Sequence, residues 1–327
     1  MSLDPRLTRA LRIGGQVLVL VVIAWYVYQS LAKGLAQSNF AALRLDWRWL
    51  ALSWVLLAGY YAIYTLGLDA ILRTLGSPST YAKAFKLNFA SNLGKYVPGG
   101  FWPALGRVAL APSMSLSRAH AAVSLVLEAG LSTAGGLIVF ALSLGFGGTL
   151  PTGTQPWQWG ALALLLVVCL HPAIFRRALG VAFRVAGVDQ EPPSLSYAVT
   201  LGLVALYAVS WLVAGLAFQA FVRAVVSSAS GNFLQYAGAY AAASVAGLMV
   251  LFAPGGLGVR EGVLAVLVTP FVGAGNAVVV GFAARVWSTL LELALSAGAL
   301  AMPAPAGGAG PSHDDEGAGT VRRDDGA

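Results

Sequence analysis

The charged residues that could do chemistry in this chain lie within long apolar stretches. A charge at the centre of a bilayer costs at least about 2.5–3.5 kcal/mol, so it is kept where it faces a cavity or an opposite charge. The acids in apolar surroundings are Asp69, Glu128, Glu261 and Glu292, and the candidate basic partners are Lys95, Arg107, Arg260 and Arg285. Two interpretations are open: buried ion pairs that fix helix packing, or a polar path for a charged group such as a phosphate.

Glu128 and Glu292 occur in matching sequence contexts. Leu127–Ser132 and Leu291–Ser296 both have the pattern Leu-Glu-x-x-Leu-Ser. Arg285 precedes Glu292 by seven positions, which places both side chains on one face of a helix. The recurrence of this pattern predicts related roles for the two acids.

The remaining charged residues are expected to behave differently. Arg260 and Glu261 are adjacent in the chain, so on a helix they point apart and we expect them to pair with other segments. Asp69 lies near the end of its apolar stretch, so we expect it at the membrane interface.

Two Pro-Gly-Gly sequences interrupt apolar stretches. Pro98-Gly99-Gly100 lies within Tyr81–Ala111, and Pro254-Gly255-Gly256 lies within Phe233–Val272. Proline removes a backbone donor and glycine favours leaving the helix. Bare backbone at membrane depth is tolerated only where it faces protein or a water-filled cavity. We therefore predict two helix–break–helix hairpins, for which a re-entrant path is one interpretation.

A helix that resumes after such a break could bind an anion. Its first N–H groups are free and its dipole is positive at that end, which suits a phosphate. Gly258 would open the second resumed helix, with Arg260 near its start, whereas Phe101–Pro103 would open the first and lead to Arg107. Lys95 precedes the first break by three residues. The alternative interpretation is that these glycines let helices pack closely.

The composition requires a membrane to hold these residues. Of the 327 residues, 58% are hydrophobic and 10% are charged, whereas a soluble domain has about 45–50% apolar and about 25% charged residues. This excludes soluble and disordered proteins, and continuous apolar runs favour helices over a barrel. We predict an all-α polytopic integral membrane protein with about six full spans in addition to the hairpins. The predicted spans are Ile13–Leu31, Trp49–Leu72, Leu116–Leu144, Trp157–Phe175, Tyr197–Phe221 and Ala277–Ala301.

Loop charges predict the orientation, because basic loops remain in the cytoplasm. With a cytoplasmic N-terminus, the uncharged loops Gly145–Gln155 and Val225–Asn232 lie outside. The basic loops that then lie inside carry Arg73, Lys83, Lys86, Arg176, Arg177 and Arg184, whereas Lys33, Arg44 and Arg48 do not fit. The hairpins would enter from opposite faces as an inverted repeat, with halves at about 81–145 and 233–301. The competing interpretation makes Phe233–Phe252 a full crossing and places the C-terminus outside.

Catalytic and metal-binding signatures are missing from the sequence. Gly94-Lys95 lacks the rest of a P-loop, and no Gly-x-Ser-x-Gly element occurs. The single cysteine, Cys169, excludes a disulfide framework, and the three histidines have no metal-ligand spacing. We expect neither an enzyme nor a cofactor or metal, and no nucleic-acid partner. An intramembrane lipid-modifying enzyme with Glu128 or Glu292 as general base is one alternative.

One segment carries a family resemblance. Pro254–Gly262, with the sequence Pro-Gly-Gly-Leu-Gly-Val-Arg-Glu-Gly, resembles the signature of the lysylphosphatidylglycerol synthase transmembrane-region family, which includes the flippase part of the multiple peptide resistance factor. Asn92–Pro103 resembles the first hairpin of stand-alone members, and the resemblance extends over about residues 10–301. The family's charged cluster after the first hairpin is reduced here, because Glu128 is followed by Ala129 and Gly130. The soluble aminoacyl-transferase domain of fused members has no counterpart, so we expect no aminoacylation.

The resemblance implies a flippase-like protein that moves a lipid headgroup across the inner membrane. We expect an anionic phospholipid or a polyprenyl-phosphate-linked lipid, carried by one domain over residues 1–301 that precedes a disordered cytoplasmic tail at 302–327. The second alternative is a non-transporting membrane partner of a lipid-linked glycosyltransferase. The predicted substrate-binding residues are Lys95, Pro98, Gly99, Gly100, Arg107, Glu128, Pro254, Gly255, Gly256, Gly258, Arg260, Glu261, Arg285 and Glu292.

Overall fold

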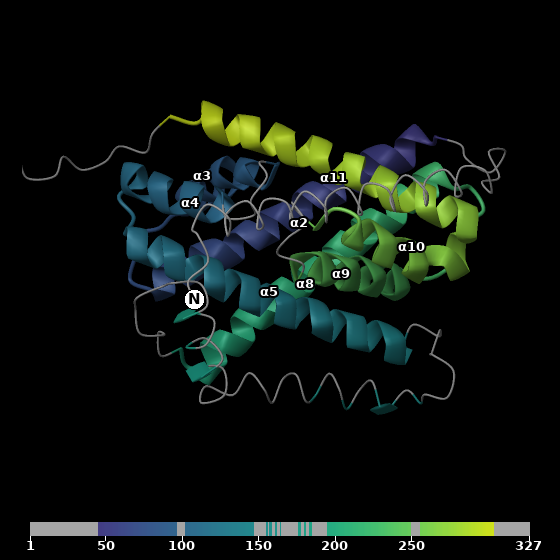
Figure 1. The fold of residues 1–327 in the computed structure, drawn as a ribbon, viewed down its shortest axis with the longest axis horizontal. Helices are drawn as coiled ribbons and strands as arrows, with labels where there is room; N and C mark the ends of the chain where they lie inside the picture. Colours follow the sequence, from purple (N-terminus) through teal and green to yellow (C-terminus); the bar gives the residue numbers. More distant parts are fainter. Residues whose placement is uncertain are drawn as a thin grey trace, which may run out of the picture.

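The computed structural model describes residues 45–96, 102–146, 195–249 and 256–303, together with a few separate positions between 155 and 184. This part of the chain is helical and contains no β-strand (Figure 1). Four of its helices are long and apolar enough to cross a membrane. They are α2 (Trp47–Thr74), α5 (Arg118–Phe146), α8 (Tyr197–Val225) and α11 (Ala274–Ala301).

These four helices correspond to four of the six predicted spans. Their starts follow ordinary capping rules: Asp46 accepts hydrogen bonds from two N–H groups of α2, and Ser196 accepts one from Val199 in α8. The predicted span Ile13–Leu31 lies outside the described residues, as does nearly all of Trp157–Phe175. A count of six full spans is therefore still a prediction.

Shorter helices occupy the two stretches that contain Pro-Gly-Gly. The first stretch holds α3 (Tyr81–Asn92), the 3₁₀ turn η2 (Leu93–Tyr96), α4 (Trp102–Leu110) and the 3₁₀ turn η3 (Ala111–Met114). The second holds α9 (Phe233–Met249) and α10 (Val259–Val272). The predicted helix starts after the breaks are confirmed, because α4 begins at Trp102 and α10 begins at Val259. The residues Pro98, Gly99, Gly100, Pro254 and Gly255 lie outside the described part.

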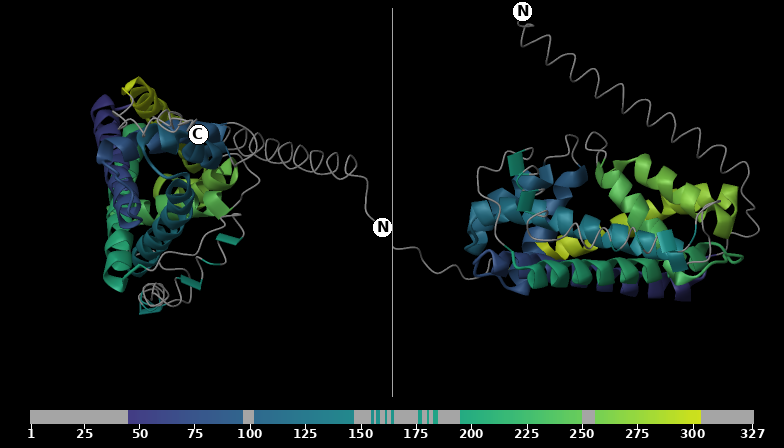
Figure 2. Two further views of the ribbon diagram at one scale, coloured as in Figure 1. Left: turned by 90° about the vertical axis from the view of Figure 1, so that its left-hand side faces the viewer. Right: turned by 90° about the horizontal axis from the view of Figure 1, so that it is seen from below.

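The long helices run between two ends of the molecule. At the Met302 end, α2 finishes, α5 begins and α11 finishes; there Ser77 Oγ contacts His120 Nδ1 at 2.8 Å, and Lys86 Nζ donates to the Met302 carbonyl at 2.7 Å. At the Asp46 end, α2 begins and α8 finishes, and the Asp46 N–H donates to the Ala224 carbonyl at 2.9 Å. Helices α2 and α8 are therefore antiparallel neighbours (Figure 2).

Each pair of shorter helices begins and finishes at one end of the molecule. Helix α3 follows the end of α2, and α4 leads through η3 to the start of α5, so this pair belongs to the Met302 end (Figure 1). Helices α9 and α10 belong to the Asp46 end, where the Ser230 N–H donates to the Phe271 carbonyl at 3.0 Å. The two pairs thus approach the interior from opposite ends.

Glycine permits the close packing of the central helices. A Cβ atom at Gly67 in α2 would lie 2.6 Å from the ring of Tyr207 in α8, and one at Gly135 in α5 would lie 2.9 Å from the backbone of Ala208. A Cβ atom at Gly215 in α8 would overlap Ala237 in α9. Small residues therefore set the distance between α8 and its neighbours.

Candidate functional site

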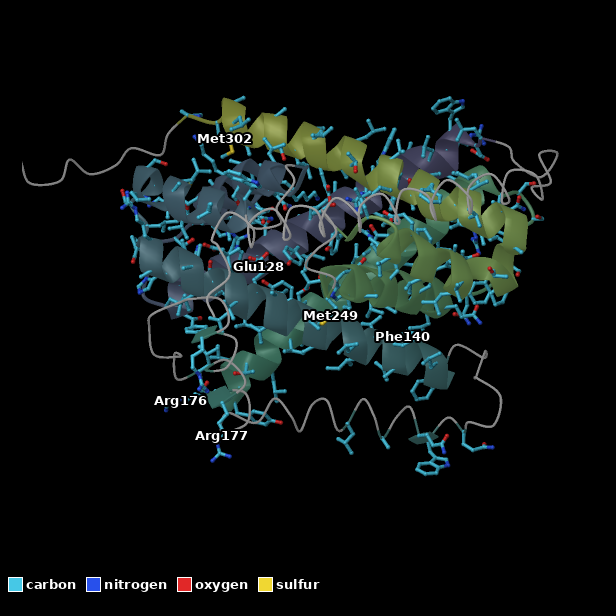
Figure 3. All side chains as sticks on the ribbon, in the orientation of Figure 1. Glu128, Phe140, Arg176, Arg177, Met249 and Met302 are labelled. Atoms are coloured by element: carbon cyan, nitrogen blue, oxygen red, sulfur yellow. The ribbon has the colours of Figure 1, made fainter. Side chains whose placement is uncertain are left out.

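The first buried charge cluster joins α3, α4 and α5. Arg107 in α4 forms an ion pair with Glu128 in α5, and its Nη2 donates to the Asn88 side-chain oxygen in α3 at 3.0 Å. The two charged side chains are only 5% and 6% exposed. Glu128, which is labelled in Figure 3, is buried. The pair satisfies the buried-ion-pair interpretation, because each charge neutralises the other.

The second cluster joins segments that are far apart in the sequence. Lys95 in η2 forms an ion pair with Glu292 in α11, and Tyr61 in α2 donates its hydroxyl to the same carboxylate. The Lys95 side chain is 21% exposed, so it is less enclosed than the Arg107 side chain, which is 5% exposed. Glu292 therefore receives hydrogen bonds from two other helical segments.

Arg260 lies in α10 beside the second cluster. Its guanidinium carbon is 4.9 Å from the centre of the Tyr240 ring in α9, which is a cation–π geometry. Lys95 and Glu292 are close enough for electrostatic interaction with Arg260. Within the described part of the chain, no carboxylate lies within ion-pair distance of the Arg260 guanidinium. Arg260 is thus a half-buried residue whose guanidinium has no ion-pair partner among the described residues.

Glu261 and Arg285 form a separate pair. Arg285 Nη1 lies 3.6 Å from Glu261 Oε1, and the Gly258 N–H donates to Glu261 Oε2 at 2.7 Å. The expectation that Glu261 pairs with another segment is therefore confirmed, because Arg285 belongs to α11. Among the described contacts the partner of Arg285 is Glu261, although Arg285 and Glu292 share a helix.

The start of α10 also differs from the sequence prediction. Glu261 caps the helix through the Gly258 N–H, so this donor is used locally and is not available to a phosphate. Gly256 and Gly258 have φ angles of 70° and 84°, which L residues rarely adopt. A Cβ atom at Gly256 would lie 2.7 Å from Gly247 in α9. These two glycines therefore have a packing and backbone role, as the alternative interpretation proposed.

The charges of the second cluster do not balance. Lys95, Arg260 and Arg285 face Glu261 and Glu292, so the cations among these described residues exceed the acids by one. An excess positive charge inside a low-dielectric interior favours binding of an anion. This cluster, rather than the closed Arg107–Glu128 pair, has the electrostatics of a binding site.

Tyrosines connect the two clusters, and sequence reasoning did not select them. The ring of Tyr60 lies 4.8 Å from that of Tyr61 and 5.7 Å from that of Tyr64, and Tyr64 lies 5.1 Å from Tyr207, measured between ring centres. The hydroxyls of Tyr64 and Tyr207 lie close enough to the Glu128 carboxylate for electrostatic interaction. The signal in the sequence was the Tyr60-Tyr61-x-x-Tyr64 pattern on one side of an apolar span.

Asp69 lies away from both clusters, near the Met302 end of α2. Its carboxylate pairs with Arg73 at 2.8 Å and accepts a hydrogen bond from Ser79 at 2.6 Å. The side chain of Arg73 is 59% exposed, which agrees with a position near the end of the span. Asp69 therefore has a structural role, in a local ion pair and hydrogen bond.

No group of three or more His, Cys, Asp or Glu residues that could hold a metal ion occurs within the described ranges.

The comparison with known families agrees with these features. A family model described as the lysylphosphatidylglycerol synthase TM region matches residues 13–312, which is most of the chain. No curated protein matches the chain significantly.

Proposed function

Because the chain belongs to the lysylphosphatidylglycerol synthase transmembrane region family, we propose that it is a flippase-like protein that moves a lipid headgroup across the membrane. The family and the apolar helices support a multi-pass membrane protein with a role in lipid metabolism. The substrate in this proposal is an anionic phospholipid or a polyprenyl-phosphate-linked lipid. Its acyl chains stay in the bilayer while the headgroup alone uses a polar path.

Arg260 carries the proposal. Its guanidinium is supported by Tyr240 and has no ion-pair partner among the described residues, and it belongs to a cluster with excess positive charge. A guanidinium binds a phosphate through two parallel hydrogen bonds. Lys95 is the second phosphate ligand in this proposal, since a bound phosphate competes with Glu292 for its ammonium group.

An inverted repeat supplies the path. In this proposal α2, α3, α4 and α5 correspond to α8, α9, α10 and α11. The correspondence is supported by packing, because α3 contacts α11 as α9 contacts α5, and α2 contacts α11 as α8 contacts α5. Two tryptophans occupy corresponding places in this scheme. Trp54 Nε1 in α2 donates to a carbonyl of α11, and Trp211 Nε1 in α8 donates to a carbonyl of α5.

The two short-helix pairs are the re-entrant hairpins of this scheme. The α3–α4 pair enters from the Met302 end and the α9–α10 pair from the Asp46 end, which is the arrangement of an inverted repeat. The Met302 end carries Arg73, Lys83, Lys86 and Arg118, so we place it in the cytoplasm by the positive-inside rule. The proposed location is the inner or plasma membrane, with a cytoplasmic N-terminus.

Reconstitution tests the proposal. The full-length protein in liposomes is expected to speed the appearance of fluorescent phosphatidylglycerol or of a labelled polyprenyl phosphate on the opposite leaflet. Arg260→Gln removes the guanidinium and should slow this exchange at least about tenfold, whereas Arg260→Lys, which keeps the charge, should retain part of it.

Arg184→Gln is the matched control, because Arg184 is an exposed arginine far from the cluster in sequence. It should leave the exchange unchanged. Melting temperatures of all variants separate loss of function from loss of fold. If well-folded wild-type protein accelerates neither lipid, the flippase proposal is wrong and a non-transporting partner of a glycosyltransferase becomes the better explanation.

A further inference from the structure

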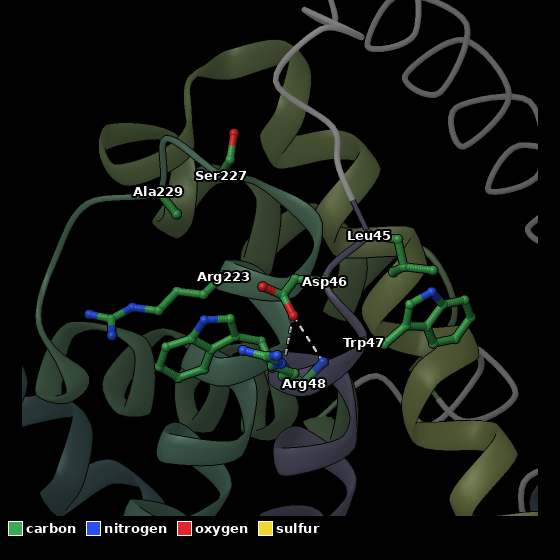
Figure 4. A pocket seen from close by; sticks show the side chains of 8 residues that line it. Leu45, Asp46, Trp47, Arg48, Arg223, Ser227 and Ala229 are labelled. Carbon is green, nitrogen blue, oxygen red and sulfur yellow. Dashed lines mark hydrogen bonds between the residues drawn. The ribbon is translucent and has the colours of Figure 1, made fainter.

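The Asp46 end of the molecule contains a hollow that the proposed transport site does not use. It has a volume of about 690 Å³ and lies between the start of α2 and the end of α8. Figure 4 shows the side chains that line it, which include Asp46, Trp47, Arg48, Trp49, Arg223 and Ser227. Its chemistry is that of two arginines beside tryptophan rings.

The described lining of this hollow has an excess of positive charge, with two arginines and one aspartate. Arg48 and Arg223 are both exposed, and neither side chain forms an ion pair with a described residue. The Arg223 guanidinium lies over the Trp49 ring, 5.3 Å from its centre, which holds the charge in place. Among the described lining residues the one acid is Asp46, and its Oδ1 accepts hydrogen bonds from the N–H groups of Arg48 and Trp49.

Arg223 differs in this respect from the arginine at the equivalent place on the antiparallel helix. Arg73 lies in the last turn of α2, as Arg223 lies in the last turn of α8. Arg73 pairs with Asp69 four residues earlier, at 2.8 Å. The residue four before Arg223 is Gln219, whose amide donates to the Gly231 carbonyl. Arg223 therefore has no carboxylate four residues earlier to pair with.

The position of the hollow at the ends of two candidate membrane spans places it at the membrane interface. Two of the four candidate membrane spans terminate here, so the hollow lies where these helices leave the hydrocarbon. Trp47 is 69% exposed and Trp49 is 37% exposed, as expected for residues at the headgroup level. At the headgroup level, lipid phosphates are anions that two arginines could bind.

We propose that this hollow is a peripheral binding site for an anionic glycerophospholipid, held through its phosphate by Arg48 and Arg223. Guanidinium groups suit phosphate oxygens, and each basic residue near an anionic surface adds to the attraction. The glycerol backbone of the lipid lies against Trp47 and Trp49. This site is separate from the central cluster and stands whether or not the protein transports lipid.

Native mass spectrometry of the full-length protein in detergent tests the site, with dioleoylphosphatidylglycerol as the probe. Arg223→Gln and Arg48→Gln should each weaken binding of the tightest lipid by roughly fivefold to tenfold, and Arg223→Lys should weaken it less. Arg177→Gln, which removes another exposed arginine, should change binding less than about twofold, a shift too small for loss of a phosphate contact. Melting temperatures confirm that each variant is folded.

The other outcomes each overturn the proposal. Unchanged binding in both glutamine variants shows that the arginines do not hold the lipid. Equal binding of dioleoylphosphatidylcholine shows that the site does not select an anionic headgroup, and displacement of the lipid by inorganic phosphate alone shows a general anion site. The exchange assay tests Arg260 and this binding assay tests Arg48 and Arg223, so a failed flippase proposal and a failed peripheral site give different results.

Discussion

Lys95 and Glu292 form an ion pair although 197 positions separate them in the chain. The lysine belongs to the segment just before the first Pro-Gly-Gly and the glutamate to the last long helix, so the contact ties the two proposed halves together. Glu292 also accepts a hydrogen bond from the Tyr61 hydroxyl. A movement of one half relative to the other must therefore exchange the partners of this carboxylate.

A double-mutant cycle should measure the coupling between these residues. Glu292→Gln leaves the Lys95 ammonium without its anion, so it should destabilise the protein more than the combined change Lys95→Met with Glu292→Gln. We expect a coupling energy of about 1–3 kcal/mol. Urea or thermal unfolding in detergent measures it. A coupling near zero would show that the pair does not hold the halves together.

The Arg107–Glu128 pair should behave as a scaffold. Both side chains are almost fully buried, so Glu128→Ala should destabilise the protein by about 3–5 kcal/mol by leaving an uncompensated charge. Replacing both residues, Arg107→Met with Glu128→Leu, should recover most of that loss. Unfolding of the purified variants checks this. Wild-type stability of Glu128→Ala would contradict the scaffold role and assign Glu128 to the polar path.

Removal of two different tyrosine hydroxyls should change the stability of the protein in opposite ways. Tyr61→Phe deletes a hydrogen bond to a charged carboxylate and should cost about 1.5–3 kcal/mol. The buried Tyr207 hydroxyl has no hydrogen-bond partner among the described residues, so Tyr207→Phe should be neutral or stabilising. Melting temperatures of the two variants side by side test the contrast. An equal loss in both would show that Tyr207 has a partner in solution.

Glycine at the contact between α8 and α9 should be sensitive to one added methyl group. Gly215→Ala places a Cβ atom against Ala237 and should cost about 1–3 kcal/mol through overpacking. Gly202 lies on the same helix with nothing within 4 Å of its would-be Cβ, so Gly202→Ala is the matched control and should be tolerated. Similar stability of both variants would mean that α8 and α9 do not pack this closely.

The proposed orientation can be tested by labelling exposed serines as cysteines. With Cys169 replaced by serine, Ser113→Cys at the Met302 end and Ser230→Cys at the Asp46 end should react with a membrane-impermeant maleimide from opposite sides. Both positions are exposed. Labelling of both from one side would exclude hairpins that enter from opposite faces.

Local composition was enough to predict the class of protein and the limits of its elements. The predicted spans Trp49–Leu72 and Ala277–Ala301 match α2 and α11 closely, because about 20 continuous apolar residues are the length of a membrane-spanning helix. The helix starts at Trp102 and Val259 followed from proline and glycine, whose backbone effects act within a few residues. The family was visible in Pro254–Gly262 for the same reason, since that motif is contiguous.

The choice of charge partners was decided by the tertiary structure. The spacing of Arg285 and Glu292 allowed contact along one helix, but Arg285 pairs with Glu261 and Glu292 pairs with Lys95. Buried charges pair with whatever opposite charge the packing brings within about 4 Å, and here the partners come from different helices. The charge left over on Arg260, which marks the proposed binding site, arises from that assignment of partners and exists only in the folded assembly.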